Sequence, residues 1–119
     1  ARAFGVDVHA VQHHLAKSFG TTATGLSAIA AELHAKRGGP PGPTDLNTRY
    51  LTEDVPFGLV FNLAMGQLAG VAMPATRAMI DAAVLVSGVD FNQDNDLLAP
   101  LGLARETVEG LLRRVGALA

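Results

Sequence analysis

Charged side chains that could bind a substrate or assist catalysis gather in one short stretch, residues 49 to 54. The stretch contains Arg49, Glu53 and Asp54, and an uncharged run from residue 55 to residue 76 follows it. A guanidinium group can hold a carboxylate through two parallel hydrogen bonds, and a carboxylate can orient a basic imidazole and stabilise its cation. These residues therefore predict a pocket in which Arg49 binds a substrate carboxylate and Asp54 orients a catalytic base or stabilises its charge.

The same residues can also be explained by helix formation alone. A cap formed by the Thr52 hydroxyl would place Glu53 and Asp54 in the first helical turn, where the macrodipole favours carboxylates. Pro56 would still lie where the helix needs no N–H donor. Because the next 22 or so residues carry no charge, we expect this helix to be buried on almost all sides and to deliver the charged residues to the edge of the core.

This stretch also resembles a known enzyme family. The similarity is to the C-terminal helical domain of NAD(P)-dependent octopine/nopaline (opine) dehydrogenases, and it is carried by residues 49 to 56 (Arg-Tyr-Leu-Thr-Glu-Asp-Val-Pro), by Gly58-Leu59-Val60 and by Gly70-Val71-Ala72-Met73-Pro74. It extends from Phe4 to Leu103 and is most specific between residues 49 and 60. The resemblance implies the reductive joining of an α-keto acid to the amino group of an amino acid.

The resemblance further implies roles for single residues. Asp54 matches the aspartate that partners a catalytic histidine, and Arg49 matches the arginine that binds the carboxylate of the keto acid. NAD or NADP would be bound mainly by an N-terminal Rossmann domain. The sequence has no Gly-x-Gly-x-x-Gly turn after a strand, and none of its four histidines takes the place of the catalytic one. We therefore expect residues 1 to 119 to be one domain of the enzyme and to be inactive alone.

Composition and length predict an all-α fold. A chain of 119 residues can bury roughly two-thirds of its unfolded surface around one core. Alanine and leucine dominate, and no apolar pattern of period two persists, which favours helices. We expect a single helical domain of about five or six helices around the buried central helix that starts at Thr52.

Charge and cysteine content limit the partners and the compartment. A net charge of -2 gives no electrostatic basis for binding nucleic acid. The absence of cysteine excludes disulfides and thiolate catalysis, and it favours a reducing cytoplasm. The uncharged run is long enough to cross a membrane, but Asn62, Gln67 and its glycines and prolines instead favour a buried helix, a turn and a new helix that starts at Pro74.

Apolar spacing and end signals predict the remaining helices. These span residues 8 to 19 (between an Asp7 cap and a Gly20 stop), 24 to 36 (with a Glu32–Lys36 pair), 74 to 87 (ended by Gly88) and 104 to 115. Residues 38 to 43 are expected to form a stiff connector that does not divide the chain into domains, because their prolines fix the backbone and remove N–H donors.

Two patterns resemble metal sites without completing one. His9 and His13 have the spacing of a metal-binding pair on a helix, but no third ligand accompanies them. The acidic residues 90 to 96 resemble the start of a calcium loop, but Asn95 replaces its glycine and Leu101 its glutamate. We therefore expect no metal site.

A glycine-rich stripe supports a second hypothesis. Gly58, Asn62, Gly66 and Gly70 recur at every fourth position, and each glycine costs a helix about 1 kcal/mol relative to alanine. The stripe therefore predicts the close approach of another backbone, either within the core or from a further domain or substrate. The competing function is a non-catalytic helical module that forms a homodimer through this stripe.

Overall fold

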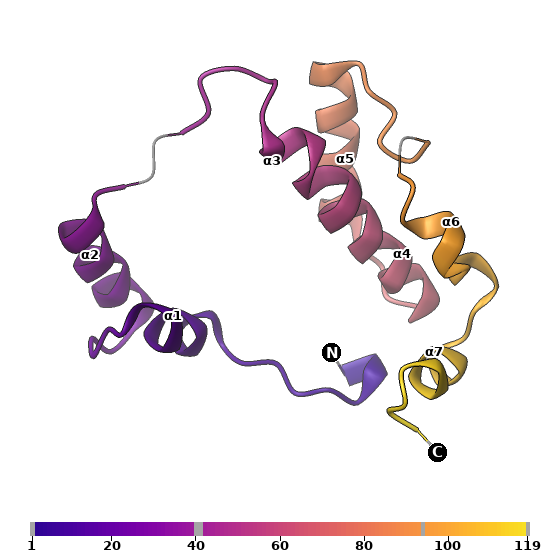
Figure 1. The fold of residues 1–119 in the computed structure, drawn as a ribbon, viewed down its shortest axis with the longest axis horizontal. Coiled ribbons are helices and arrows are strands. Elements are labelled where there is room, and N and C mark those ends of the chain that lie inside the picture. Colours follow the sequence, from indigo (N-terminus) through magenta and orange to yellow (C-terminus); the bar gives the residue numbers. More distant parts are fainter. Residues whose placement is uncertain (1, 40–41, 94, 119) are drawn as a thin grey trace. The chain divides into compact units, whose positions relative to one another are not determined.

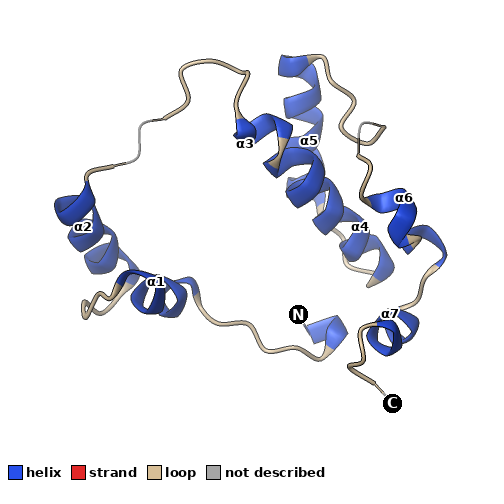
Figure 2. Cartoon of the chain, viewed as in Figure 1, coloured by secondary structure: helices blue, strands red, loops and turns tan. Residues whose placement is uncertain are grey.

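A computed structural model describes residues 2–39, 42–93 and 95–118. Within these ranges every regular element is a helix (Figures 1 and 2), which confirms the predicted single small all-α domain. Contacts between residues separate two compact units within it, Ala1–Gly42 and Pro43–Ala119. The boundary between these units falls in the segment from residue 38 to residue 43, which we expected to be a stiff connector. Residues 40 and 41 of this connector lie outside the described ranges.

The first unit contains η1 (Arg2–Phe4), α1 (Val11–Phe19) and α2 (Leu26–Arg37). α1 ends at Gly20, which has the left-handed conformation, as predicted. It begins later than predicted, because the backbone of Ala10 is still extended and Ala10, not Asp7, is the N-cap.

A polar network joins the loop after α1 to α2. The hydroxyl group of buried Thr21 donates to Glu32 and accepts from the N–H of Ala23 at 3.1 Å. Glu32 also pairs with Lys36 one turn later, which confirms that prediction. A hydrogen bond from Lys36 and, with a smaller effect, one from Thr21 lower the pKa of Glu32. The network ties the loop after α1 to α2, whose side chain Ile29 is buried.

The second unit carries the candidate site. Its elements are α3 (Arg49–Thr52), the π-helix η2 (Asp54–Val60), α4 (Phe61–Leu68), α5 (Pro74–Ser87), α6 (Leu98–Leu101), η3 (Leu103–Arg105) and α7 (Val108–Arg114). α5 begins at Pro74 and ends before a left-handed Gly88, as predicted. α7 begins later than predicted because Thr107 caps it, its hydroxyl oxygen accepting from the N–H of Gly110 at 2.9 Å.

The core of the second unit lies between η2, α5 and the loop after α5, and α5 runs beside η2 in Figure 1. Its buried side chains are Val55, Val60, Ile80, Ala83 and Phe91. In the described part of the chain no helix is both long enough and apolar enough to cross a bilayer.

The predicted cap at Thr52 is wrong. α3 already begins at Arg49, after Thr48, and the Thr52 hydroxyl donates back to the Thr48 carbonyl at 3.2 Å, as a threonine inside a helix does. Glu53 and Asp54 therefore lie one turn beyond the helix start. The stabilisation by the helix dipole that we expected for them does not apply, because that effect is confined to the first turn.

Pro56 lies inside the helical segment and not in its first turn. α3, η2 and α4 follow one another along one helical path (Figure 1), and Pro56 is the third residue of η2. A proline in an α-helix lacks the N–H donor, and its ring clashes with the carbonyl group four residues earlier. The wider π turn moves that carbonyl away from the ring, so Pro56 accounts for the change from α to π geometry.

The segment is less buried than predicted. Of η2, Val55, Pro56 and Val60 are buried, while Gly66 is the buried residue of α4. The other side chains of the segment are half-buried or exposed. In the described part of the second unit α5, α6, η3 and the nearby loops cover parts of the segment, so its lack of charge does not correspond to burial on all sides.

The glycine stripe forms no tight helix crossing. A Cβ atom on Gly58 or Gly70 would meet nothing within 4 Å, and Gly70 forms a turn with φ of +67°. Only Gly66 is crowded, because its Cβ would overlap the side chain of Met73 and lie 3.2 Å from the carbonyl oxygen of Val71. The close approach comes from the turn that follows α4 and not from another helix.

Replacing Gly58 and Gly66 by alanine should change stability in opposite directions. Gly58→Ala should stabilise the fold by about 0.5–1 kcal/mol, because the methyl group is unobstructed and glycine is unfavourable in a helix. Gly66→Ala should destabilise it by about 1–3 kcal/mol through overpacking against Met73. Urea unfolding of the two variants measures both changes, and shifts of the same sign would contradict the assignment.

Candidate functional site

Arg49 and Glu53 form an ion pair on the surface of the second unit. The Nε atom of Arg49 lies 3.9 Å from an Oε atom of Glu53, and both side chains are exposed. An exposed pair of this kind contributes at most about 1 kcal/mol. Arg49 can therefore exchange Glu53 for a substrate carboxylate at little cost in free energy.

Asp54 is the first residue of η2, and its side chain is exposed. Together with Glu53, Phe57 and Gly58 it lines a shallow depression. Among the ion pairs of the described residues none involves Asp54, so Arg49 is paired with Glu53 and not with Asp54. The structure thus brings Arg49 and Asp54 to the same helical segment and leaves the Asp54 carboxylate available to a partner.

An apolar groove of about 390 Å³ lies next to this depression. Phe57 lines both hollows, and it separates the carboxylates from the groove. The groove is lined by Leu46, Asn47, Leu51, Thr52, Pro56, Phe57, Val86, Ser87, Val89 and Phe91. Sequence analysis missed it because its walls come from two segments that are far apart in the sequence, residues 46 to 57 and 86 to 91, and no local pattern links them.

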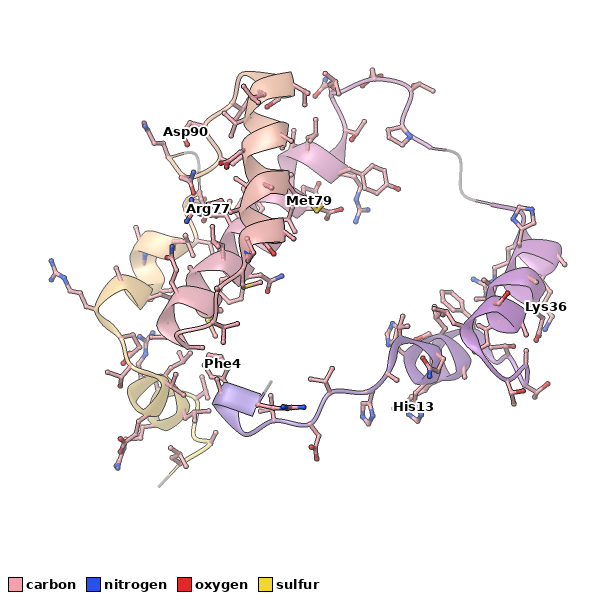
Figure 3. The ribbon with its side chains drawn as sticks, turned by 180° about the vertical axis from the view of Figure 1, so that it is seen from behind. Phe4, His13, Lys36, Arg77, Met79 and Asp90 are labelled. Atoms are coloured by element: carbon pink, nitrogen blue, oxygen red, sulfur yellow. The ribbon has the colours of Figure 1, made fainter. Side chains whose placement is uncertain are left out.

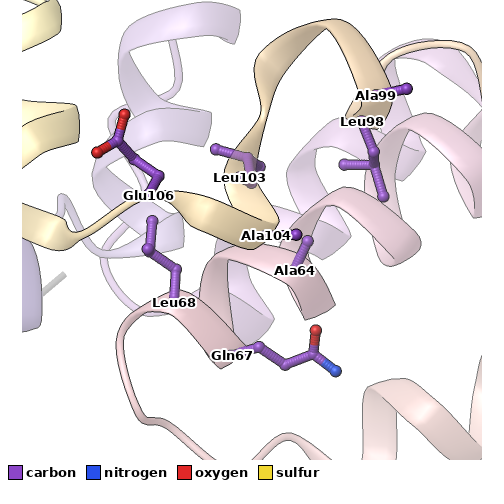
Figure 4. A pocket seen from close by; sticks show the side chains of 8 residues that line it. All are labelled: Ala64, Gln67, Leu68, Leu98, Ala99, Leu103, Ala104 and Glu106. Atoms are coloured by element: carbon purple, nitrogen blue, oxygen red, sulfur yellow. The ribbon is translucent and has the colours of Figure 1, made fainter.

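A second pocket, of about 610 Å³, lies between α4, α6 and η3 (Figure 4). Its walls are mostly apolar, and Glu106 is its one acidic residue. The Glu106 carboxylate accepts from the N–H of Thr107 and from Arg114, both at 2.9 Å, and these two contacts lower its pKa. Because both carboxylate oxygens are already engaged, Glu106 serves to tie α7 to the chain ahead of it.

The histidines and aspartates whose spacing resembled metal sites make contacts within their own segments. The rings of His9 and His13 are stacked with centroids 4.7 Å apart. Asp90 accepts from the N–H of Asn92 at 3.1 Å in a turn, while Asp94 lies outside the described residues. No three metal-binding side chains come together in the ranges that the structure describes.

Comparison with known proteins identifies the family. A profile described as NAD/NADP octopine/nopaline dehydrogenase, alpha-helical domain, matches residues 1–86. The chain belongs to this family. An opine dehydrogenase from Arthrobacter sp. (strain 1C) is 32% identical to this chain over 111 residues, which are 93% of this chain and 31% of the relative. The chain thus spans about a third of that relative's length. No solved structure matches.

The matching profile describes a family of NAD/NADP dehydrogenases. A nicotinamide nucleotide is usually bound by a strand, a Gly-x-Gly-x-x-Gly turn and a helix N-terminus. The described residues contain neither a strand nor this turn. The described residues therefore do not fit the nucleotide. Arg49 and Asp54 both fall within residues 1–86, the range that the family profile matches.

Proposed function

We propose that the chain is the substrate-binding and partly catalytic helical domain of an NAD(P)-dependent opine dehydrogenase. In this reaction the amino group of an amino acid condenses with an α-keto acid, water leaves, and the resulting C=N bond is reduced. The observation that supports the proposal best is the placement of an exposed guanidinium and a carboxylate at the start of η2 in a chain of this family. The nucleotide that supplies the hydride belongs to a Rossmann domain elsewhere in the enzyme.

Arg49 is proposed to bind the carboxylate of the keto acid. Its guanidinium group is exposed, and its one ion pair among the described residues is the 3.9 Å contact with Glu53. A carboxylate that accepts two parallel hydrogen bonds forms a stronger and better oriented pair than this single contact. Substrate binding would therefore displace Glu53 and fix the keto acid in one orientation.

Asp54 is proposed to act through a histidine of the neighbouring part of the enzyme. A carboxylate that accepts a hydrogen bond from one imidazole nitrogen holds the other nitrogen in the tautomer that takes a proton. It also stabilises the imidazolium ion that then forms. The exposure of Asp54 is required for this role, because the imidazole comes from outside the described residues.

The 119-residue chain alone should bind neither NADH nor NADPH and should show no oxidoreductase activity. The physical reason is that it lacks the turn whose backbone N–H groups hold the pyrophosphate. Isothermal titration calorimetry with each nucleotide tests this, with the complete enzyme as the positive control. Micromolar binding by the chain alone would contradict the assignment of the nucleotide to another domain.

The second candidate function is a non-catalytic helical module that associates with a copy of itself. Exposed apolar side chains on α5 favour it, since Met79 and Leu85 expose 61% and 85% of their surface. Figure 3 labels Met79 on this helix. The encoding reading frame distinguishes the two functions. A frame that also encodes a Rossmann unit upstream supports the enzyme, and a frame without one supports the module.

A further inference from the structure

The side chain of Asn95 connects the loop before α6 to η2. Asn95 is buried, with 6% of its surface exposed. Its Nδ2 donates to the carbonyl oxygen of Pro56, which is 39 positions away in the sequence. Its Oδ1 accepts from the N–H groups of Leu97 and Leu98 at 3.0 Å and 3.2 Å. The amide therefore fixes the start of α6 with one atom and holds η2 with the other.

This arrangement requires an amide at position 95. Two N–H donors face one end of the side chain and a carbonyl oxygen faces the other, so the orientation of the amide follows from its partners. An aspartate would keep the acceptor at one end and place an oxygen against the Pro56 carbonyl at the other. Because the site is buried, a carbonyl group left without its donor would destabilise the turn that contains it.

The hydrogen bond acts on the turn that presents Asp54. Pro56 lies two residues after Asp54 in η2, and it is the residue that accounts for the π geometry. Asp54 has no ion pair of its own among the described residues, so its orientation depends on the backbone of this turn. Asn95 supplies the contact from outside the helix that holds the backbone here.

We propose that Asn95 is a positioning residue for Asp54. By binding the Pro56 carbonyl it holds the first turn of η2, and with it the Asp54 carboxylate, in the orientation that the reaction needs. This inference rests on the proposed catalytic role of Asp54. Asn95 itself lies beyond residues 1–86, the range that the family profile matches.

The test compares Asn95→Asp with Asn92→Asp in the complete enzyme. Asn92 is exposed in the same loop, so its replacement makes the same change in charge and size without touching η2. Asn95→Asp should lower kcat by on the order of 10- to 100-fold, as a small misplacement of a reacting group does. The KM for the keto acid, which depends on Arg49, should stay within about two-fold. Asn92→Asp should leave both constants unchanged.

Repeating Asn95→Asp in an Asp54→Asn background shows whether the two residues act together. If Asn95 acts through Asp54, the second substitution should lower kcat by less than about two-fold in this background. A decrease equal to that in the wild-type background would overturn the inference. The inference would also be overturned if Asp54→Asn lowers kcat but Asn95→Asp alone leaves kcat unchanged. If Asp54→Asn alone has no effect, it is the proposed function that fails.

Asn95→Ser is a second variant that tests the same inference if the Asn95→Asp enzyme does not fold. A serine hydroxyl can still accept from the N–H groups at the start of α6, but it is too short to reach the Pro56 carbonyl. Measured below the melting temperature, it should show the same selective loss of kcat. Full activity of a folded Asn95→Ser enzyme would overturn the inference.

Discussion

Asp54→Asn in the complete enzyme should lower turnover by on the order of 100-fold or more. In the Ser-His-Asp template the equivalent change costs about 10,000-fold with the geometry intact, because an amide neither holds the productive tautomer nor stabilises the imidazolium. We expect a smaller loss here, since hydride transfer also depends on the position of the nicotinamide. Turnover and melting temperature should be measured on the same preparation.

The matched control for this experiment is Asp81→Asn. Asp81 is an exposed aspartate on α5, outside the depression that Asp54 lines. The Asp81→Asn substitution removes the same charge from the same unit and should leave turnover unchanged. If Asp54→Asn retains turnover within a few-fold of the wild type, Asp54 has no catalytic role. An unchanged melting temperature with a large loss of turnover would separate catalysis from folding.

Arg49→Lys should weaken binding of the keto acid while leaving turnover at saturation nearly unchanged. Lysine keeps the charge but loses the planar fork that matches a carboxylate. A hydrogen bond to a charged group contributes about 1.5–3 kcal/mol, which corresponds to a KM about 10- to 150-fold higher. Steady-state kinetics with the keto acid as the varied substrate measures this change.

Arg77→Lys provides the matching control. Arg77 is an exposed arginine on α5 (Figure 3), and it lies outside the hollows beside η2. Its replacement should not affect the KM for the keto acid. An Arg49→Lys enzyme with the wild-type KM would remove Arg49 from the substrate site.

The parts of the fold that sequence could predict are those with local signals. Pro74 and Gly88 define the ends of α5, because a proline suits the first helical turn and a glycine the residue after the last. Arg49 and Asp54 could be proposed as site residues because they are charges next to a long uncharged run, in a stretch that resembles the family. None of these inferences depended on contacts between distant segments.

The parts of the fold that could not be predicted depend on contacts between distant segments, or on a choice between two nearby residues that could each cap the helix. Thr48 and Thr52 are both acceptable caps by composition, but α3 begins at Arg49 with Thr48 as its N-cap. The π turn at Pro56 changes the spacing of apolar residues by one position, which a search for α periodicity does not detect. Its buried hydrogen bond to Asn95 joins residues 39 positions apart.

The π turn also determines which side chains before and after it face the core. Val55 and Val60 are both buried, at 4% and 3% exposure, although they are five positions apart. In an uninterrupted α-helix residues at this spacing point about 140° away from each other, whereas hydrogen bonds between residues five apart align them. In one uninterrupted α-helix the apolar side chains of α3 and those of α4 would therefore point in different directions around the helix axis; we call these directions their rotational phases. The one extra residue in η2 joins the two phases, so that Leu51 of α3 and Leu63 of α4 pack against the same core as Val55 and Val60.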